Sequence, residues 1–202
     1  MPGPKAPEEE RREQILGAAH NVALKSGIDG VTLRAVAAEA GLSHGLVVFY
    51  FKRKDLLIDA VLDRALMNTA QLHIPGEVAR IAHPTDRLSA LVQEELARQV
   101  RDPRGMRLFF EYWALGVRQP AIRLRVSAAL ERYRAAFRAV AEEMLAHEAP
   151  SGTQLNADGL AAVAVSLING FAVQAMLDPE GFDTEAYLAA VQGLVEGVGS
   201  EG

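Results

Sequence analysis

Hydrophobic residues recur at spacings of three and four along most of this chain, the pattern of helices that bury one face. No segment shows the period-two alternation of a half-buried strand. Proline and glycine interrupt the pattern at intervals, where helix breakers are expected. The pattern predicts helices over residues 8–25, 32–40, 43–50, 86–101, 105–118, 121–147, 156–177 and 184–198, with one more through Leu56, Leu57, Ala60, Val61 and Ala65.

Capping residues predict the limits of the first three helices. Gly27 follows Ser26 at the end of the first helix, and glycine readily takes the left-handed conformation of a C-cap. Thr32 is placed to cap the second helix, which Gly41 ends, and Ser43 is placed to cap the third. The result is two short helices joined by a tight turn, the layout of a helix-turn-helix. An ordinary helical hairpin fits the same spacing.

The segment from residue 159 to residue 177 holds no charged residue over nineteen positions. A membrane span needs about 20 apolar residues, so that interpretation arises here. Ser166, Asn169 and Gln174 within the segment, and the lack of basic residues flanking it, argue against a span. The sequence favours a helix buried on nearly all faces, partly by a partner subunit.

Composition narrows the class of protein. The chain has 202 residues, half of them hydrophobic, with few aromatics and no cysteine, so disulfides and thiolate chemistry are excluded. The opening residues lack the apolar core of a signal peptide and indicate a flexible tail over residues 1–7. We therefore expect an all-α protein of the cytoplasm.

Charge is spread unevenly along the chain. The net charge is −5, yet residues 1–55 hold eight Lys and Arg against seven Asp and Glu, and three of these cations form the run 52–54. This weak bias permits a small DNA-binding head on an acidic body.

Residues 32–57 read TLRAVAAEAGLSHGLVVFYFKRKDLL, and this stretch resembles the DNA-binding head of the TetR family of transcriptional regulators. The resemblance implies a homodimeric repressor that binds double-stranded operator DNA and is released by a small-molecule effector. It also implies a helix-turn-helix domain over residues 8–55 and a ligand-binding and dimerisation domain over residues 56–202. The positions on the family pattern are Thr32, Arg34, Val36, Ala37, Ala40, Gly41, Leu42, Ser43, Gly45, Tyr50, Phe51, Lys54 and Leu57.

The resemblance implies DNA-binding roles that local physics supports. The free N–H groups of the helix after Thr32 suit a backbone phosphate. The first turn of a recognition helix, here with His44 and Gly45, reads bases in helix-turn-helix proteins. Solvated surface charges are the simpler interpretation of Arg34 and Lys54. The full set of predicted DNA contacts is Thr32, Arg34, Ser43, His44, Gly45, Phe49, Tyr50 and Lys54.

One position departs from the family pattern. Val48 stands where the family commonly has a tyrosine whose hydroxyl binds the DNA backbone. Valine cannot donate that hydrogen bond, and the neighbouring Phe49 offers only apolar contact, for example to a thymine methyl group. Tyr50 either replaces the phosphate contact or belongs to the core.

The body resembles regulators of the choline–betaine pathway within the same family, in the run Tyr112-Trp113-Ala114 and in the segment around Asn169. Residues 109–113 include four aromatic side chains, which is more than one face of a helix can bury. A cation over such rings gains ~0.5–2 kcal/mol, so a quaternary ammonium ligand fits them, although core packing is the simpler role for each ring. The predicted ligand-binding residues are Phe109, Phe110, Tyr112, Trp113 and Asn169.

Two apolar helices near the C-terminus predict the dimer. Two such helices from each subunit close a four-helix bundle, in which small residues permit near approach. The predicted interface residues are Ala164, Leu167, Ala172, Ala175, Leu188, Val191 and Val195.

Catalytic chemistry finds little support in the sequence. The five histidines have no metal-ligand spacing, and the chain has no glycine-rich phosphate loop and no nucleophile elbow. We expect no enzyme activity, no metal and no cofactor. A helical enzyme and a helical adaptor without DNA binding remain the alternatives.

Overall fold

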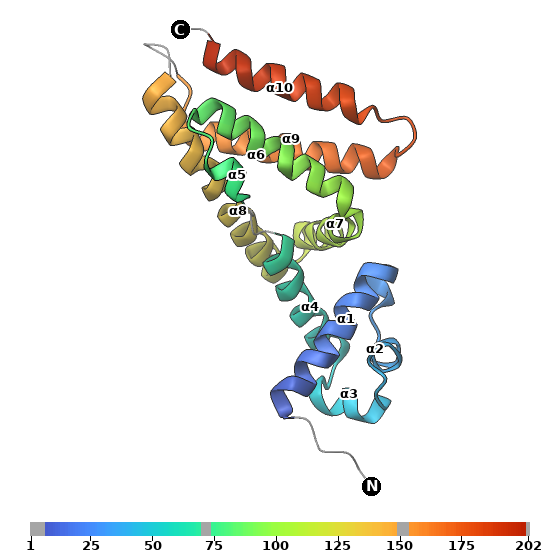
Figure 1. Ribbon diagram of the computed structural model, residues 1–202. Coiled ribbons are helices and arrows are strands. Elements are labelled where there is room, and N and C mark those ends of the chain that lie inside the picture. The colour runs from blue at the N-terminus through green and yellow to red at the C-terminus, as the bar shows by residue number, and fades with distance from the viewer. Residues whose placement is uncertain (1–6, 70–73, 149–153, 201–202) are drawn as a thin grey trace. The chain divides into compact units, whose positions relative to one another are not determined.

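The computed structural model describes residues 7–69, 74–148 and 154–200, and within these ranges every regular element is a helix (Figure 1). The all-α prediction is therefore confirmed. Residues 1–6 of the predicted tail lie outside the described residues. The helices are α1 (Glu8–Gly30), α2 (Leu33–Ala40), α3 (His44–Tyr50), α4 (Lys54–Thr69), α5 (Gly76–Ala79), α6 (Pro84–Arg101), α7 (Pro103–Arg118), α8 (Pro120–Glu148), α9 (Ala157–Leu177) and α10 (Thr184–Ser200).

The helices belong to two compact units. The first unit comprises residues 1–69 and 104–126, and the second comprises residues 70–103 and 127–202. The first unit is larger than the predicted head because α7 and the start of α8 belong to it. The functional division at residue 55 stays a prediction.

In the first unit, α1 packs against α2 and α4, and α2 packs against α3 (Figure 1). Three glutamates, Glu8, Glu9 and Glu10, occupy the first turn of α1, where negative charge favours the helix dipole. The Arg12 guanidinium lies 4.7 Å from the centre of the Phe51 ring and covers that edge of the core. The buried face of α1 consists of Ile15, Ala18, Ala19, Val22, Ala23 and Ile28.

The predicted stop of the first helix at Gly27 is confirmed, and one further helical turn follows this kink. At Gly27 the backbone has φ 73° and ψ 179°, and the helix then resumes to Gly30. Positive φ at Gly27 is therefore confirmed, but its ψ is extended rather than left-handed helical. Helix α5 was not predicted, because four residues are too few to establish a periodicity.

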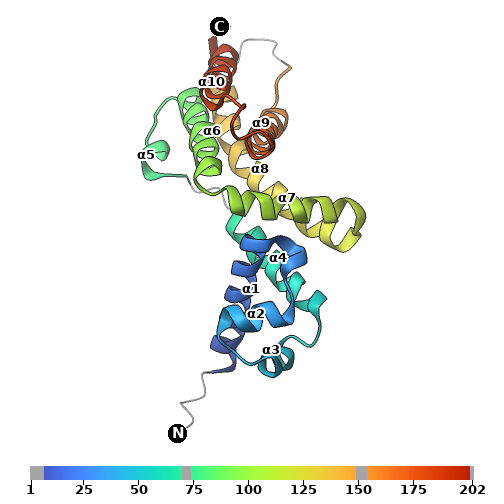
Figure 2. The same ribbon diagram turned by 90° about the vertical axis from the view of Figure 1, so that its right-hand side faces the viewer.

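In the second unit, α6 packs against both α9 and α10 (Figure 2). One face of α9 is buried through Ala161, Ala164, Val165, Ile168, Phe171 and Ala172. Val163 and Leu177 on the other side of α9 are exposed in the single chain, so the predicted burial by a partner subunit stays a prediction. By length and composition α9 is apolar enough to cross a membrane, with a third of its most apolar window buried.

We predict that Gly27→Ala lowers the free energy of unfolding by about 1–3 kcal/mol, because alanine is strained at this φ. An ideal Cβ at Gly27 would also lie 2.9 Å from the carboxylate oxygens of Glu111. The control is Gly17→Ala in the same helix, where a Cβ meets nothing within 4 Å and stability should rise by up to about 1 kcal/mol. Urea unfolding measures both, and equal effects of the two substitutions would contradict the prediction.

Candidate nucleic-acid interface and ligand cavity

A left-handed glycine directs the chain from α2 into α3. Gly41 has φ 66° and ψ 31°, and its N–H donates to the carbonyl of Ala38 at 3.2 Å. The N–H of Leu42 donates to the carbonyl of Ala37 at 2.9 Å, which completes a Schellman-type end of α2. The turn predicted from Gly41 is therefore confirmed, and it fixes the direction in which α3 leaves α2.

Both predicted N-caps are present. Thr32 Oγ1 accepts from the N–H of Ala35 at 3.1 Å, and Ser43 Oγ accepts from the N–H of Leu46 at 3.3 Å. Each hydroxyl accepts through its oxygen, so its own hydrogen remains able to donate to an anion. Both cap residues are exposed.

The outer face of α3 carries the predicted base-reading residues. His44 and Gly45 are exposed in its first turn, whereas Val47 on the opposite side is fully buried. Phe49 is 71% exposed, and its ring meets the half-buried Tyr50 edge-on at 5.3 Å. An exposed phenylalanine at this place offers a rigid apolar surface to a groove. Val48, at the departure from the family pattern, is half-buried.

Cations flank α3 on the described surface. Arg34 is exposed on α2, and Lys52 is exposed in the turn before α4. Lys54 Nζ donates to the carbonyl of Asp29 at 3.4 Å, which ties the start of α4 to the end of α1 while the side chain stays exposed. The Arg53 guanidinium beside Asp55 lowers the pKa of that carboxyl through their hydrogen bond. Arg53 is thereby partly neutralised, so Lys52 and Lys54 are the stronger phosphate candidates.

An unpredicted contact fixes the kink of α1. Glu111 on α7 accepts from the N–H of Ile28 at 2.6 Å, in the space that the absent Cβ of Gly27 leaves open. Arg107, one turn earlier on α7, donates to the carbonyl of Leu24 at 2.8 Å. Glu111 thus holds α1 against α7. The contact joins residues 83 positions apart and has no sequence signal.

A second set of contacts holds α4 in the same unit. Tyr112 on α7 donates from its hydroxyl to the carbonyl of Ile58 at 3.2 Å. Arg125 at the start of α8 pairs with Asp63 and with Asp59, the latter at 3.0 Å. Helix α7 and the start of α8 therefore hydrogen-bond to both α1 and α4, the helices that precede and follow the α2–α3 pair in the chain.

The predicted ligand-binding residues do not line one cavity within either unit. Phe109 and Tyr112 are buried in the first unit, and Trp113 is 45% exposed there. The Phe110 ring meets Phe109 edge-on and Trp113 at a tilt, with its ring centre 5.6 Å from each of theirs. Asn169 belongs to the second unit. The role of these residues in ligand binding therefore stays a prediction.

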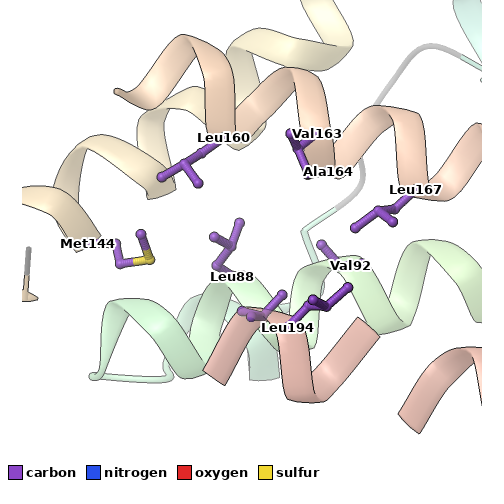
Figure 3. Close-up of a pocket in the computed structure, with 9 residues that line it drawn as sticks. Leu88, Val92, Met144, Leu160, Val163, Ala164, Leu167 and Leu194 are labelled. Atoms are coloured by element: carbon purple, nitrogen blue, oxygen red, sulfur yellow. The ribbon is translucent and has the colours of Figure 1, made fainter. Parts of the chain in front are cut away.

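The second unit holds a cavity of about 210 Å³ that α6, α8, α9 and α10 enclose (Figure 3). Side chains from α9 lie on one side, and side chains from the other three helices point toward the same space. No charged or hydrogen-bonding side chain lines it. The lining residues are Leu88, Val92, Met144, Leu160, Val163, Ala164, Leu167, Leu194 and Val195. Three of the predicted interface residues line this cavity: Ala164, Leu167 and Val195.

A buried polar cluster joins α6 to α8 in the second unit. Glu95 is 1% exposed and accepts from Arg98 at 2.6 Å and from the Tyr133 hydroxyl at 2.6 Å. The oxygen of the buried Gln99 side chain has no hydrogen-bond partner among the described residues. Burial, and then the Glu95 charge, raises the pKa of Tyr133 well above its ordinary value. The cluster specifies how α6 meets α8, since an unpaired carboxylate there would be costly.

The predicted dimer interface lies on α9 and α10 of the second unit. Ala164, Ala172 and Val191 are buried within their own chain. Four others are half-buried against the second unit's core: Leu167, Ala175, Leu188 and Val195. The interface therefore stays a prediction. The exposed large apolar residues of α9 and α10 are Val163, Leu177 and Leu194.

Comparisons with known proteins agree with this geometry. Residues 15–61 match the model of bacterial regulatory proteins of the tetR family, and residues 84–199 match the C-terminal model of BetI-type transcriptional repressors. An uncharacterized HTH-type transcriptional regulator in the dhlA 5′ region of Xanthobacter autotrophicus is 34% identical over 181 residues, which cover 86% of this chain and 84% of that protein.

Two further comparisons extend over nearly the whole chain. The HTH-type transcriptional regulator BetI of Paraburkholderia phymatum is 31% identical and covers 93% of this chain and 92% of its own length. A transcriptional regulator from Saccharomonospora viridis, solved in complex with choline, has a TM-score of 0.72 at 22% identity and covers 94% of this chain and 97% of its own. That second likeness shows the fold.

We predict that Tyr133→Phe flattens the loss of stability at alkaline pH. Because the folded-state pKa of Tyr133 is raised, its contribution is complete below about pH 10 and falls as pH rises above that value, by about 1.4 kcal/mol per unit. At pH 8 the substitution should cost about 1–3 kcal/mol, since Glu95 loses a donor. Urea unfolding between pH 8 and pH 11 measures both, and parallel curves for the two proteins would contradict the assigned burial.

Proposed function

Since the chain belongs to the TetR family, with a BetI-type C-terminal region, it is a DNA-binding transcriptional repressor and not an enzyme, and we propose that α3 reads its operator. The observation that supports this most is the exposed tip of α3, where His44 and Gly45 follow the Ser43 cap on a helix with no charged residue. Base contacts from such a helix are limited to the histidine and to apolar surfaces.

Each predicted DNA residue has a distinct part in this proposal. Thr32, Ser43 and Lys54 hold backbone phosphates, and Arg34 contacts either a phosphate or a base edge. His44 donates to or accepts from a base edge, and the absence of a side chain at Gly45 lets the helix approach the groove. Phe49 contacts a thymine methyl group where Val48 supplies no hydroxyl. Tyr50, which is half-buried, reaches a phosphate only through its ring edge and hydroxyl.

We also propose that a small-molecule effector releases the repressor, as is typical of this family. The cavity of the second unit supports an effector with an aliphatic portion, because its walls are entirely apolar. The aromatics of α7 and Asn169 stay candidates for a cationic effector, an idea that the choline complex of the Saccharomonospora protein makes worth testing. Any true effector must lower operator affinity by the same factor by which operator lowers effector affinity, and titrations in both directions measure this.

The protein acts in the cytoplasm as a homodimer in this proposal, as TetR-family regulators dimerise. A two-fold axis would set the two α3 helices about 34–36 Å apart, or a multiple of that distance, and would demand a near-palindromic operator. The DNA-binding part is residues 8–55, and the remainder binds the effector and the partner subunit.

We predict that selection of bound duplexes from a random pool yields one near-palindromic sequence. Selection with His44→Ala should yield the same half-site spacing but a relaxed preference at one base pair of each half-site, worth about 1–3 kcal/mol. The exposed position of His44 makes the substitution harmless to folding. Recovery of unrelated duplexes by the parent protein would contradict operator binding.

We predict that Lys54→Ala weakens binding to every duplex and lowers the slope of log affinity against log salt by about 0.9, as loss of one phosphate contact does. Lys25→Ala is the matched control, because Lys25 is an exposed lysine of the same unit that already pairs with Glu39 at 2.7 Å. Fluorescence anisotropy of labelled duplexes at salt concentrations from about 50 to 200 mM measures the slope of log affinity against log salt for each variant. An unchanged slope for Lys54→Ala would remove this residue from the interface.

A further inference from the structure

The start of helix α3 is not anchored by the hydrophobic core. Residues 41–45, which include the base-reading candidate His44, are exposed or half-buried, and Val47 is the first fully buried residue of the helix. The other end of α3 is held by the core, because Phe51 is 2% exposed and lies beneath the Arg12 guanidinium. Base contacts need a defined geometry, so the start of α3 depends on a constraint other than apolar burial.

One side chain of α1 supplies a polar contact at this place. Gln14 Nε2 donates to the carbonyl of Ala40 at 3.0 Å, across 26 positions of the sequence. Ala40 is the last residue of α2, and the last four carbonyls of a helix have no partner within that helix. The amide of Gln14 thus joins α1 to the residue that directly precedes the Gly41 turn, through which the chain enters α3.

The chemistry of this contact suits an amide. Arg11, one turn earlier on α1, donates to Gln14 Oε1 at 2.5 Å, so the oxygen end of the amide is occupied. The NH2 end therefore faces Ala40, because a guanidinium requires an acceptor and a carbonyl requires a donor. A carboxylate at position 14 would lose the donor, and an apolar side chain would lose both contacts.

We propose that Gln14 is a positioning residue for operator recognition, which fixes the Gly41 turn and with it the base-reading start of α3, without touching DNA. In the absence of this bond the turn takes additional positions, and only a fraction of the molecules presents His44 correctly to the groove. The apparent affinity for the operator falls by that fraction. The inference rests on the proposed reading of the operator by α3, and it adds a residue outside the predicted set of DNA contacts.

Direct contact of Gln14 with the DNA backbone is the alternative role. The specificity ratio, which is the affinity for the operator divided by the affinity for a random duplex, separates the two roles. Phosphate contacts contribute to the binding of every sequence, whereas base contacts contribute to the operator alone. Loss of a phosphate contact therefore lowers both affinities together. Loss of positioning lowers the operator affinity and leaves the random-duplex affinity unchanged.

The test compares Gln14→Met, Gln14→Lys and the control Asn21→Met. Gln14→Met removes the donor of an exposed side chain without changing the net charge, and the specificity ratio should fall about three- to tenfold, the range that one hydrogen bond covers. Gln14→Lys keeps a donor for the Ala40 carbonyl, so its ratio should match that of the parent while its added charge strengthens binding to both duplexes. Asn21 is an exposed amide of the same helix, and its substitution should change neither affinity.

Fluorescence anisotropy with the selected operator and with a random duplex of equal length measures both affinities, and circular dichroism checks that each variant is folded. A parallel loss of both affinities in Gln14→Met would identify Gln14 as a DNA contact and overturn the inference. An unchanged ratio in this variant, or an equal loss of ratio in Gln14→Lys or Asn21→Met, would also overturn it. A parent protein that selects no operator would overturn the proposed function and this inference together, so the two failures are distinguishable.

Discussion

The first unit depends on one contact, the acceptance of the Ile28 N–H by the Glu111 carboxylate in the space left by Gly27. A charged hydrogen bond of this kind contributes about 1.5–3 kcal/mol, and it forms only because no Cβ occupies that space. The kink of α1 and the position of α7 therefore determine each other. Since α1 packs against α2 and α4, the contact also sets where the recognition helix stands relative to α7.

This arrangement bears on how a repressor is released from DNA. Helix α7 hydrogen-bonds to α1 through Arg107 and Glu111, and to α4 through Tyr112. A displacement of α7 would thus act on both helices that carry the α2–α3 pair. The aromatic residues between positions 109 and 113 lie on the same helix. A ligand that repacked those rings would therefore displace a helix that is hydrogen-bonded to α1 and α4.

The packing of the second unit is less strongly specified by its sequence, because helix α9 is apolar on more than one face. The cluster of Glu95, Arg98 and Tyr133 joins α6 to α8 through buried hydrogen bonds. The four helices α6, α8, α9 and α10 leave a cavity lined by apolar side chains, and α9 has an exposed apolar face. Both features lower the stability of an isolated chain in water, and both are relieved when a ligand or a partner covers them.

The sequence by itself determined the local elements of this protein. Periodicity gave the long helices, and Thr32, Gly41 and Ser43 gave the limits of α2 and α3, because caps and left-handed turns depend on neighbouring residues alone. The family pattern over residues 32–57 was equally local, and it carried the function. These features needed no knowledge of what lies across the fold.

Only the tertiary structure decided which faces meet. Glu111 meets the kink of α1, Tyr112 contacts α4, and Ala172 is buried within its own chain. Each of these assignments depends on contacts between residues far apart in the chain. An apolar helix such as α9 presents hydrophobic residues on every side, so its sequence cannot say which side is inside. Packing against α6 made that choice, because burying one face of α9 leaves the other for water, a ligand or a partner.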